Sequence, residues 1–453
     1  MAASQVSMHG QWSSRWVFIM AATGSAVGLG NIWRFPYVTG ENGGGAFVLV
    51  YLVCVLTVGI PIMISEVMLG RRGRQSPINT MRDLAADEGR GAQWQLVGWL
   101  GVAAGFLILS FYSVVAGWSL AYVFHVAQGA FNEATAEVSS AHFADLTGSA
   151  ARLTAWHSLF MLMVIGVVAR GVKGGLERAV KWLMPALFVL LIVMVLYASS
   201  TGDFNGAFRY LFEADFSKIT PETILAALGQ AFFSLSLGMG SIIIYGAYLS
   251  KESSITQTTI IIGGVDTLVA VLAGMAIFPI VFGYGLEPGS GPGLVFVSLT
   301  IAFGQMPGGQ LFGTLFFVLL TVAAWTSAIS LLEPVTAWLV ETARWSRLKA
   351  SAIAGFGAWL LGLGSLLSFN EWQDRVFAGR NFFDWAEFLS TTVMLPLGGL
   401  FIALFCGWRL STASARDELA TNGLIFSVWH FLVRVVAPIG VVAIFLNAIG
   451  VIG

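Results

Sequence analysis

Long apolar segments, separated by short polar ones, follow one another along almost the whole chain. A helix that crosses a bilayer needs roughly 20 mainly apolar residues, because each residue adds about 1.5 Å to a path of about 30 Å. Segments of that length predict eleven transmembrane helices, near residues 15–38, 43–70, 96–127, 153–170, 177–200, 222–249, 257–284, 309–342, 350–369, 382–407 and 426–450. The apolar segment 292–305 is too short to span, so it predicts a short helix on a long loop outside the membrane.

Composition supports an integral membrane protein. Of 453 residues, 57% are hydrophobic and 10% are charged, whereas about 25% of a soluble chain is charged. The lipid bilayer must therefore be the main solvent. A net charge of −1 argues against nucleic acid as a partner, since the chain has no excess of positive charge to displace counterions from phosphate. Cys54 and Cys406 lie in apolar segments, which indicates buried thiols without a disulfide or metal role.

Lysine and arginine gather in alternate loops, after the second, fourth, sixth, eighth and tenth segments. These residues are Arg71, Arg72, Arg74, Arg82, Arg90, Arg170, Lys173, Arg178, Lys181, Lys251, Arg344, Arg347, Lys349, Arg409 and Arg416. The opposite loops carry fewer basic residues over longer stretches. Because cytoplasmic loops are enriched in lysine and arginine, we expect a multi-pass protein of the plasma membrane, with its N-terminus in the cytoplasm and its C-terminus outside.

Two segments contain glycine-rich polar interruptions near their middle. Residues 23–31 read TGSAVGLGN and residues 234–240 read SLSLGMG. Close helix packing is one explanation, since small residues line such interfaces. Their matching places, in the first and sixth segments, favour instead two unwound helices around a binding site at the membrane midplane. Unwound backbone there frees carbonyl groups for a cation and a helix N-terminus for a carboxylate.

The same regions resemble a known family. The stretches that carry the resemblance are GLGNIWRFPY at 28–37, ENGGGAF at 41–47, Gly59-Ile60-Pro61, Glu66, Gly70-Arg71 and SLSLG at 234–238. Together they closely resemble the neurotransmitter:sodium symporter family, over about residues 10–450. Broken helices around a midplane site are themselves a feature of this family.

The resemblance implies a leucine-transporter-like fold. This is an all-α integral membrane protein with eleven transmembrane helices in a single domain, 1–453. Two inverted five-helix repeats, about 10–200 and 205–407, would place the broken helices first in each repeat, and an extra helix would follow at about 426–450. It also implies a symporter that works by alternating access, and no enzymatic activity.

The resemblance further implies two sodium sites. The first would consist of the Ala26 carbonyl and the side chains of Asn31, Ser234 and Asp266, together with the substrate carboxylate. The second would consist of the carbonyls of Gly24, Val27 and Ala323 and the hydroxyls of Thr326 and Ser327. All of these ligands are oxygen atoms, which hard cations prefer.

Asp266 differs from the neutral asparagine that many relatives carry at this place. A carboxylate inside a membrane is costly unless it is paired with a cation or protonated. We therefore expect Asp266 to supply a fixed negative charge beside sodium, so that chloride is not required. If the alignment of the seventh segment slips, Asp266 would only contact water. Glu66 is expected to be protonated and hydrogen-bonded beneath the substrate.

The implied substrate pocket is apolar. Its residues are Ala22, Ala26, Gly28, Gly30, Ile108, Tyr112, Phe233, Ser234, Ser236, Met239 and Leu331. None of these side chains is an acid or base that would pair with a charged substrate side chain, which favours aliphatic and aromatic L-amino acids. Met239 predicts breadth, because methionine adapts to different shapes. Each of these residues taken alone is compatible with ordinary core packing.

The resemblance also identifies gates. Arg34 and Asp384 would close the outer side above the substrate, with Phe233 as the lid. Two unrelated charges near the membrane surface are the alternative. Trp12 and the polar N-terminus would plug the inner side.

In the fifth segment, Gly175 and Pro185 match a spacing seen in the family. Proline removes a backbone donor and glycine weakens the adjacent turn. Partial unwinding there is expected to admit water to the second sodium site.

Alternatives from other classes remain open. One is a transporter of the same fold that carries another small zwitterion or an amine. The absence of an acid between Arg15 and Arg34, where amine-accepting relatives have an aspartate, disfavours the amine. Another is a channel or receptor-like membrane protein, which the paired interruptions disfavour. The sequence leaves the oligomeric state open.

Overall fold

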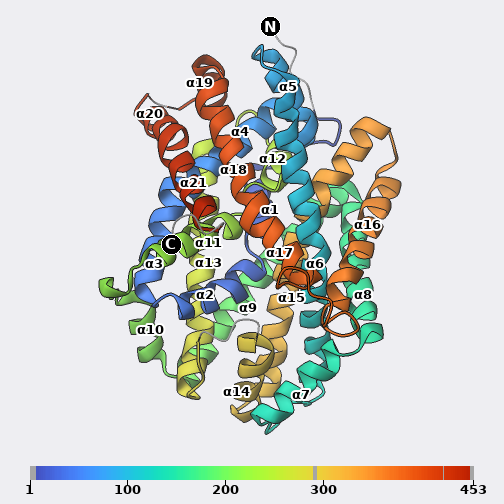
Figure 1. The fold of residues 1–453 in the computed structure, drawn as a ribbon, viewed down its shortest axis with the longest axis vertical. Coiled ribbons are helices and arrows are strands. Elements are labelled where there is room, and N and C mark those ends of the chain that lie inside the picture. Colours follow the sequence, from blue (N-terminus) through green and yellow to red (C-terminus); the bar gives the residue numbers. More distant parts are fainter. Residues whose placement is uncertain (1–6, 289–292, 422, 449–453) are drawn as a thin grey trace.

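The structure, a computed structural model, describes residues 7–288, 293–421 and 423–448. Helices form the described part of the chain, joined by turns and loops (Figure 1). The first half contains α1 (Arg15–Ala26), η1 (Gly30–Arg34), α2 (Phe35–Glu41), α3 (Gly45–Cys54), η2 (Val55–Gly59), α4 (Ile60–Gly73), α5 (Pro77–Asp87), η3 (Ala92–Trp94), α6 (Gln95–Ala127), α7 (Ala136–Thr147), α8 (Ala150–Val168), η4 (Val172–Glu177) and α9 (Arg178–Thr201).

The second half follows the same pattern of long helices with short connections. It contains α10 (Phe204–Phe212), η5 (Phe216–Lys218), α11 (Pro221–Ser234), α12 (Ser241–Ala247), α13 (Ile255–Gly283), η6 (Leu294–Ser298), α14 (Leu299–Gln305), α15 (Gly309–Ala343), α16 (Arg347–Leu367), α17 (Phe382–Glu387), η7 (Phe388–Met394), α18 (Leu395–Leu404), η8 (Phe405–Arg409), α19 (Thr412–Leu419), α20 (Gly423–Phe431), η9 (Leu432–Val436) and α21 (Ala437–Ala448). The η elements are single 3₁₀ or π turns.

The predicted spans coincide with helices. In the described part of the chain, nine helices are long and apolar enough to cross a membrane, and α1 with η1 and α2 forms a tenth, bent by 53°. The sixth predicted span corresponds to α11 and α12, whose 14 and 7 residues are each too short to span alone. The short segment predicted at 292–305 is present as η6 and α14.

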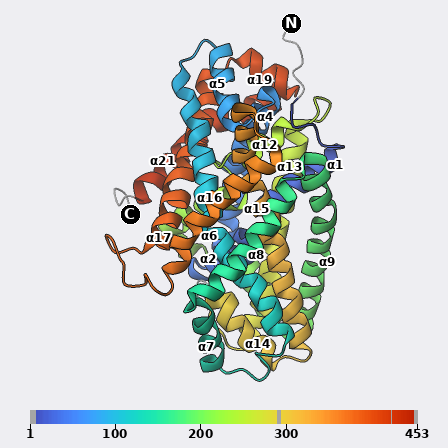
Figure 2. The same cartoon turned by 90° about the vertical axis from the view of Figure 1, so that its right-hand side faces the viewer.

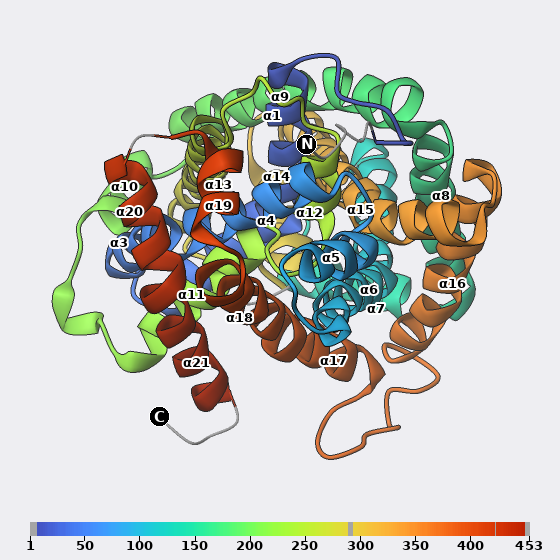
Figure 3. The same cartoon turned by 90° about the horizontal axis from the view of Figure 1, so that it is seen from above.

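The broken helices lie inside the bundle. Figure 3, a view along the long axis, shows α8, α9, α16 and α21 at the periphery and α4 and α12 near the centre, while α1 runs inward from beside α9. Figures 1 and 2 place α5 and α19 at one end of the molecule, and α7 and α14 at the opposite end. The central helices are thus shielded from lipid by their neighbours, which allows them to carry polar groups.

The central helices approach closely where glycine removes a side chain. A Cβ added at Gly70 of α4 would lie 1.9 Å from the carbonyl oxygen of Ile243 in α12. This oxygen belongs to the backbone, so it cannot turn aside as a flexible side chain would. The contact holds α4 against the inner half of the broken sixth span.

Replacing Gly70 with alanine is expected to separate α4 from α12 and lower stability by about 1–3 kcal/mol, the usual cost of overpacking. The thermal unfolding midpoint of the purified protein in detergent measures this. Gly166→Ala in α8 is the matched control, because nothing lies within 4 Å of a Cβ added there. Equal midpoints for the two variants would contradict the close contact.

Candidate functional site

The first spanning segment is unwound among its glycines. α1 ends at Ala26, and Val27 takes an extended conformation, with φ −71° and ψ 106°, instead of continuing the helix. The π-helical turn η1 resumes at Gly30. The residues between the two halves therefore leave backbone groups without helical partners.

Side chains from other helices bind these free backbone groups. The Tyr112 hydroxyl accepts a hydrogen bond from Leu29 N at 3.1 Å, and Gln230 Nε2 donates to the Gly30 carbonyl at 2.9 Å. Glycine is required at Gly28, because a Cβ there would lie 2.7 Å from the Tyr112 hydroxyl. The unwound segment is thus held in place rather than loose.

The sixth span is interrupted in a similar way. α11 ends at Ser234 and α12 begins at Ser241. Between them, Ser236, Gly238 and Gly240 have positive φ angles of 54°, 75° and 76°. These left-handed conformations favour glycine and prevent a continuous helix. Both interruptions predicted from the sequence are therefore present.

The side chains expected at the first sodium site lie together and are fully buried. Asn31 Nδ2 donates to Asp266 Oδ1 at 2.8 Å and to Ser234 Oγ at 3.0 Å. The Ser234 hydroxyl also donates to Asp266 Oδ2 at 2.5 Å. The Tyr51 hydroxyl lies 3.1 Å from Ser234 Oγ. Ala26 lines the adjoining cavity. A sodium ion at this place needs Asn31 to turn its amide oxygen, instead of its NH₂ group, toward the carboxylate, because the ion binds oxygen.

The residues expected at the second sodium site also meet. The Ser327 hydroxyl is within donating distance of two carbonyl groups, 3.2 Å from that of Val27 and 3.4 Å from that of Gly24. The Thr326 hydroxyl donates to the Ala323 carbonyl at 3.0 Å. α15 therefore presents two hydroxyl groups to the end of α1, and all of these oxygens suit a hard cation.

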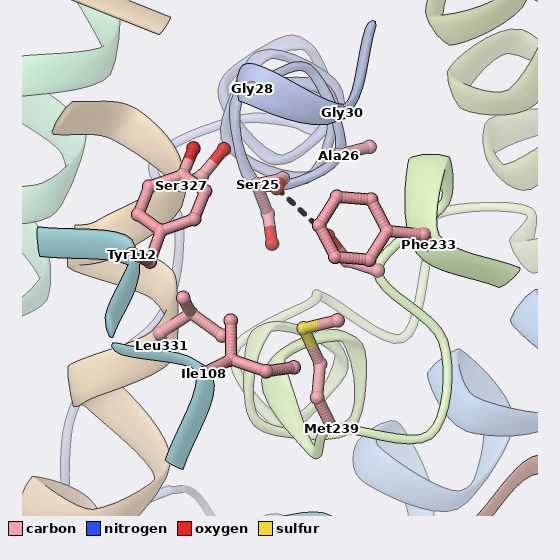
Figure 4. Close-up of a pocket in the computed structure, with 11 residues that line it drawn as sticks. Ser25, Ala26, Gly28, Gly30, Ile108, Tyr112, Phe233, Met239, Ser327 and Leu331 are labelled. Carbon is pink, nitrogen blue, oxygen red and sulfur yellow. Dashed lines mark hydrogen bonds between the residues drawn. The ribbon is translucent and has the colours of Figure 1, made fainter. Parts of the chain in front are cut away.

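A small cavity lies between the two breaks (Figure 4). It is lined by Ser25, Ala26, Gly28, Gly30, Ile108, Tyr112, Phe233, Ser236, Met239, Ser327 and Leu331. Nine of the eleven residues expected to bind substrate are among them. Ala22 and Ser234 are buried but do not line it, since Ala22 lies in the intact part of α1 and Ser234 faces Asp266. Figure 4 shows Ile108, Met239 and Leu331 opposite the unwound backbone of α1.

Two hydroxyl residues of this cavity were missing from the expected substrate pocket. Ser327 was expected only at the sodium site, and Ser25 was not expected at all. Ser25 Oγ donates to Ser330 Oγ at 2.7 Å, and the Ser236 hydroxyl donates to the Ser25 carbonyl at 2.9 Å. The interruption at 23–31 contained the signal, because Ser25 lies within it.

Glu66 of α4 accepts a hydrogen bond from the backbone of the second break. Gly238 N donates to Glu66 Oε1 at 2.7 Å, and the residue is fully buried. Its Oε2 has no hydrogen-bond partner in the described part of the chain. An ionised carboxylate with a free buried oxygen is costly, so protonation of Glu66 remains our prediction.

At the expected outer gate, Phe233 lies between this cavity and a second one, since it lines both. The Arg34 guanidinium lies over this ring, 4.7 Å from its centroid. No ion pair joins Arg34 to Asp384 among the described residues, because Asp384 caps the start of α17 and its Oδ2 accepts from Asn381 N at 3.2 Å. Glu387, one helical turn later, lines the outer cavity together with Arg34.

At the expected inner gate, a strap of residues 7–14 crosses the end of the bundle. Trp12 is 5% exposed; its Nε1 donates to the Tyr245 carbonyl at 3.1 Å, and its ring packs edge-on against Tyr245 and Tyr248. Ser13 donates through its N–H and hydroxyl to the two oxygens of Glu177, at 3.1 and 2.5 Å. The expected plug at Trp12 is thus seated on the end of α12.

α9 contacts the expected second sodium site. Gly175 lies in the π turn η4 and Pro185 lies inside α9. A Cβ added at Gly24 would lie 2.8 Å from Met184 Sδ, so the residue before the proline packs against an expected sodium ligand. Unwinding at this place remains a prediction.

This arrangement has a counterpart among known proteins. Residues 9–145 and 134–452 match the model of the sodium:neurotransmitter symporter family. The chain belongs to this family. The resemblance seen in the sequence is confirmed, and the protein is a sodium-dependent symporter of the membrane rather than an enzyme.

Relatives match this symporter over nearly their whole length. An uncharacterized sodium-dependent transporter of Bacillus subtilis is 38% identical over 446 residues, which cover 98% of each chain. One of Haemophilus influenzae is 37% identical and covers 96% of this chain and 97% of its own. The crystal structure of MhsT in complex with L-phenylalanine superposes with a TM-score of 0.90 at 45% identity, covering 97% of this chain and 99% of that one. The predicted leucine-transporter-like fold is confirmed.

Replacing Trp12 with alanine is expected to loosen the inner side, because the indole fills the space against Tyr245 and Tyr248. Amide hydrogen exchange of residues 8–26 should become about tenfold faster, as expected when a locally closed unit loses about 1.4 kcal/mol. The measurement is exchange read by mass spectrometry in detergent.

Trp16→Ala is the matched control, since this neighbouring tryptophan is 66% exposed at the surface. It should leave exchange in residues 8–26 unchanged. Similar acceleration in the two variants would show that Trp12 is not a specific plug.

Proposed function

We propose that this symporter imports hydrophobic L-amino acids, aliphatic and aromatic, together with two sodium ions, by alternating access. The observation that carries the proposal is the apolar cavity between two unwound helices, bordered by both oxygen clusters. Backbone groups freed by the breaks bind the ammonium and carboxylate groups of the substrate. The Tyr112 hydroxyl, already bonded to Leu29 N, lies where it can reach the carboxylate.

The walls of the cavity support this substrate class. Ile108, Met239, Leu331 and Phe233 are apolar, and no residue that lines it carries a charge. A charged substrate side chain would lose its hydration without gaining a partner. The presence of L-phenylalanine in the similar MhsT structure supports the same class.

Each oxygen cluster would bind one ion. The first, with Asn31, Ser234 and Asp266, borders the substrate cavity at Ala26, so a substrate carboxylate would complete it. The second, centred on Ser327, would bind an ion between α1 and α15. In the first site Asp266 supplies the negative charge, and chloride is not required.

The orientation follows from the basic loops. The N-terminal strap and α5 would face the cytoplasm, because the arginine-rich connections lie at that end. Phe233 and Arg34 would then face the outside, so that substrate enters past Phe233 and leaves past the strap.

Uptake into proteoliposomes tests the function. Labelled leucine and tryptophan are expected to accumulate with an inward sodium gradient, and not when potassium replaces sodium, because potassium cannot drive the coupled step. A competition panel should show inhibition by valine, phenylalanine and methionine, and none by lysine or glutamate. Accumulation of an amine instead, or uptake independent of sodium, would contradict the proposal.

Chloride replacement tests the role of Asp266. Substituting gluconate for chloride is expected to leave wild-type uptake unchanged, because the fixed carboxylate already balances the ion. Asp266→Asn should lower sodium affinity about tenfold or more, the effect of losing one buried charge partner worth at least about 1.4 kcal/mol. A large loss of wild-type uptake in gluconate would remove this role. Glu387→Gln, which lies in the outer cavity, is the control and should retain wild-type sodium affinity.

A further inference from the structure

An apolar groove lies on the outside of the bundle, between α6 and α18. Its walls include Leu96, Leu100 and Ala103 of α6 and Leu397 and Phe401 of α18. Leu96 is 66% exposed and Phe401 is 37% exposed. Side chains of this kind on the surface of a membrane protein face the acyl chains of the lipid, so the groove opens toward the bilayer.

The groove is about as long as one leaflet is thick. From Gln95, where α6 begins, to Ala103 the helix rises about 12 Å, at about 1.5 Å per residue. On the other wall, the path from Met394 to Phe401 is about 10 Å long by the same rule. One leaflet contributes about 15 Å to a hydrocarbon core of about 30 Å. These lengths suit one acyl chain, and they are too short for a spanning helix of another protein.

Two arginines lie where the groove reaches the end of the bundle that carries α5. Arg90 precedes the lining residue Gln93 by three positions, and its Nε donates to the Arg409 carbonyl at 3.3 Å. Trp94, which also lines the groove, packs edge-on against Phe405, one turn before Arg409. Both arginines are exposed. Neither forms an ion pair within the described ranges of the chain.

The acidic residues nearby do not cancel this charge. Glu88 accepts hydrogen bonds from Ser411 N at 3.0 Å and from the Ser414 hydroxyl at 2.6 Å. Arg72 also donates to Ser414 Oγ, at 3.1 Å, so a cation already lies beside Glu88. Residues 71–94 contain five arginines against three acids, a net charge of +2. The apolar groove thus ends at a basic surface.

We propose that the groove binds an anionic phospholipid, with one acyl chain between α6 and α18 and the phosphate held by Arg90 and Arg409. A guanidinium group matches the geometry of phosphate oxygens. Basic residues beside the membrane attract anionic lipids, which are concentrated in the cytoplasmic leaflet. In the orientation proposed above, this is the leaflet that the groove faces. The lipid site does not depend on the proposed substrate.

Native mass spectrometry of the purified symporter in detergent tests the site. Palmitoyl-oleoyl-phosphatidylglycerol is the probe, and phosphatidylcholine with the same chains is the comparison, because only the first has a net negative head group. The tightest bound phosphatidylglycerol is expected to have an affinity at least about fivefold higher than phosphatidylcholine, which is the factor that one basic residue near a membrane surface contributes.

Substitutions at the basic end separate the head group from the chain. Arg90→Gln combined with Arg409→Gln should weaken phosphatidylglycerol binding by about fivefold for each arginine and leave phosphatidylcholine binding unchanged. Arg178→Gln is the matched control. Arg178 is an exposed arginine at the start of α9, and Figure 3 shows α9 on the side of the bundle opposite to α18. This control should bind phosphatidylglycerol like the wild type.

Filling the groove tests the place of the chain. Ala103→Trp puts an indole into the groove from an exposed position, so it should weaken the binding of both lipids. A ligand that binds only the folded protein raises the unfolding midpoint, and this rise with phosphatidylglycerol should be lost in Ala103→Trp. Leu162→Trp, at a position of α8 that is 65% exposed and outside the groove, should retain the rise.

Three results would overturn the lipid site. The first is equal affinity for the two lipids, and the second is unchanged phosphatidylglycerol binding in the double arginine variant. The third is a dimer in the mass spectrum that Ala103→Trp abolishes, because the groove would then be an interface between two copies of the chain. None of these measurements involves transport, so a failure of sodium-driven uptake would contradict the proposed function and leave the lipid site intact.

Discussion

Unpaired peptide groups in the middle of a membrane are the constraint on which this structure depends. Lipid offers no hydrogen bonds, so each group freed by the breaks in α1 and α11–α12 must find a partner inside the protein. Tyr112, Gln230, Glu66 and Ser327 supply these partners from α6, α11, α4 and α15. The surrounding helices therefore supply hydrogen-bond partners for part of the freed backbone. The remaining free backbone groups are available to ions and substrate.

One unwound segment serves every part of the site. Gly24 and Val27 face Ser327, Asn31 faces Asp266, and Ala26 borders the cavity. A change in the conformation of this segment would shift both oxygen clusters and the cavity wall together. We propose this shared segment as the physical basis for coupling, because ligands that share a flexible element alter each other's affinity by the same factor.

The sequence predicts the elements well because the bilayer fixes their length and glycine fixes the breaks. It predicts the two oxygen clusters because family motifs carry them. The sequence does not predict which residue each acidic side chain contacts at the expected gates. Ser13 and Glu177 are 164 positions apart, and the length of an apolar segment says nothing about such pairing. Asp384 shows the same limit, since a local cap competes for its carboxylate with the distant Arg34.

The two gates that we propose are held by different contacts, and this has consequences for how each would open. The outer lid is a single ring, Phe233, with the Arg34 guanidinium over it. Rotation of one side chain would join the two cavities. The inner strap is held by an indole, by Glu177 and by Glu341, in contacts that belong to one short segment. If contacts on one short segment break together, we expect inner opening to be a cooperative step rather than a rotamer change. The free energy of such a step depends on each of the three contacts, so weakening one contact would lower the cost of opening the whole strap.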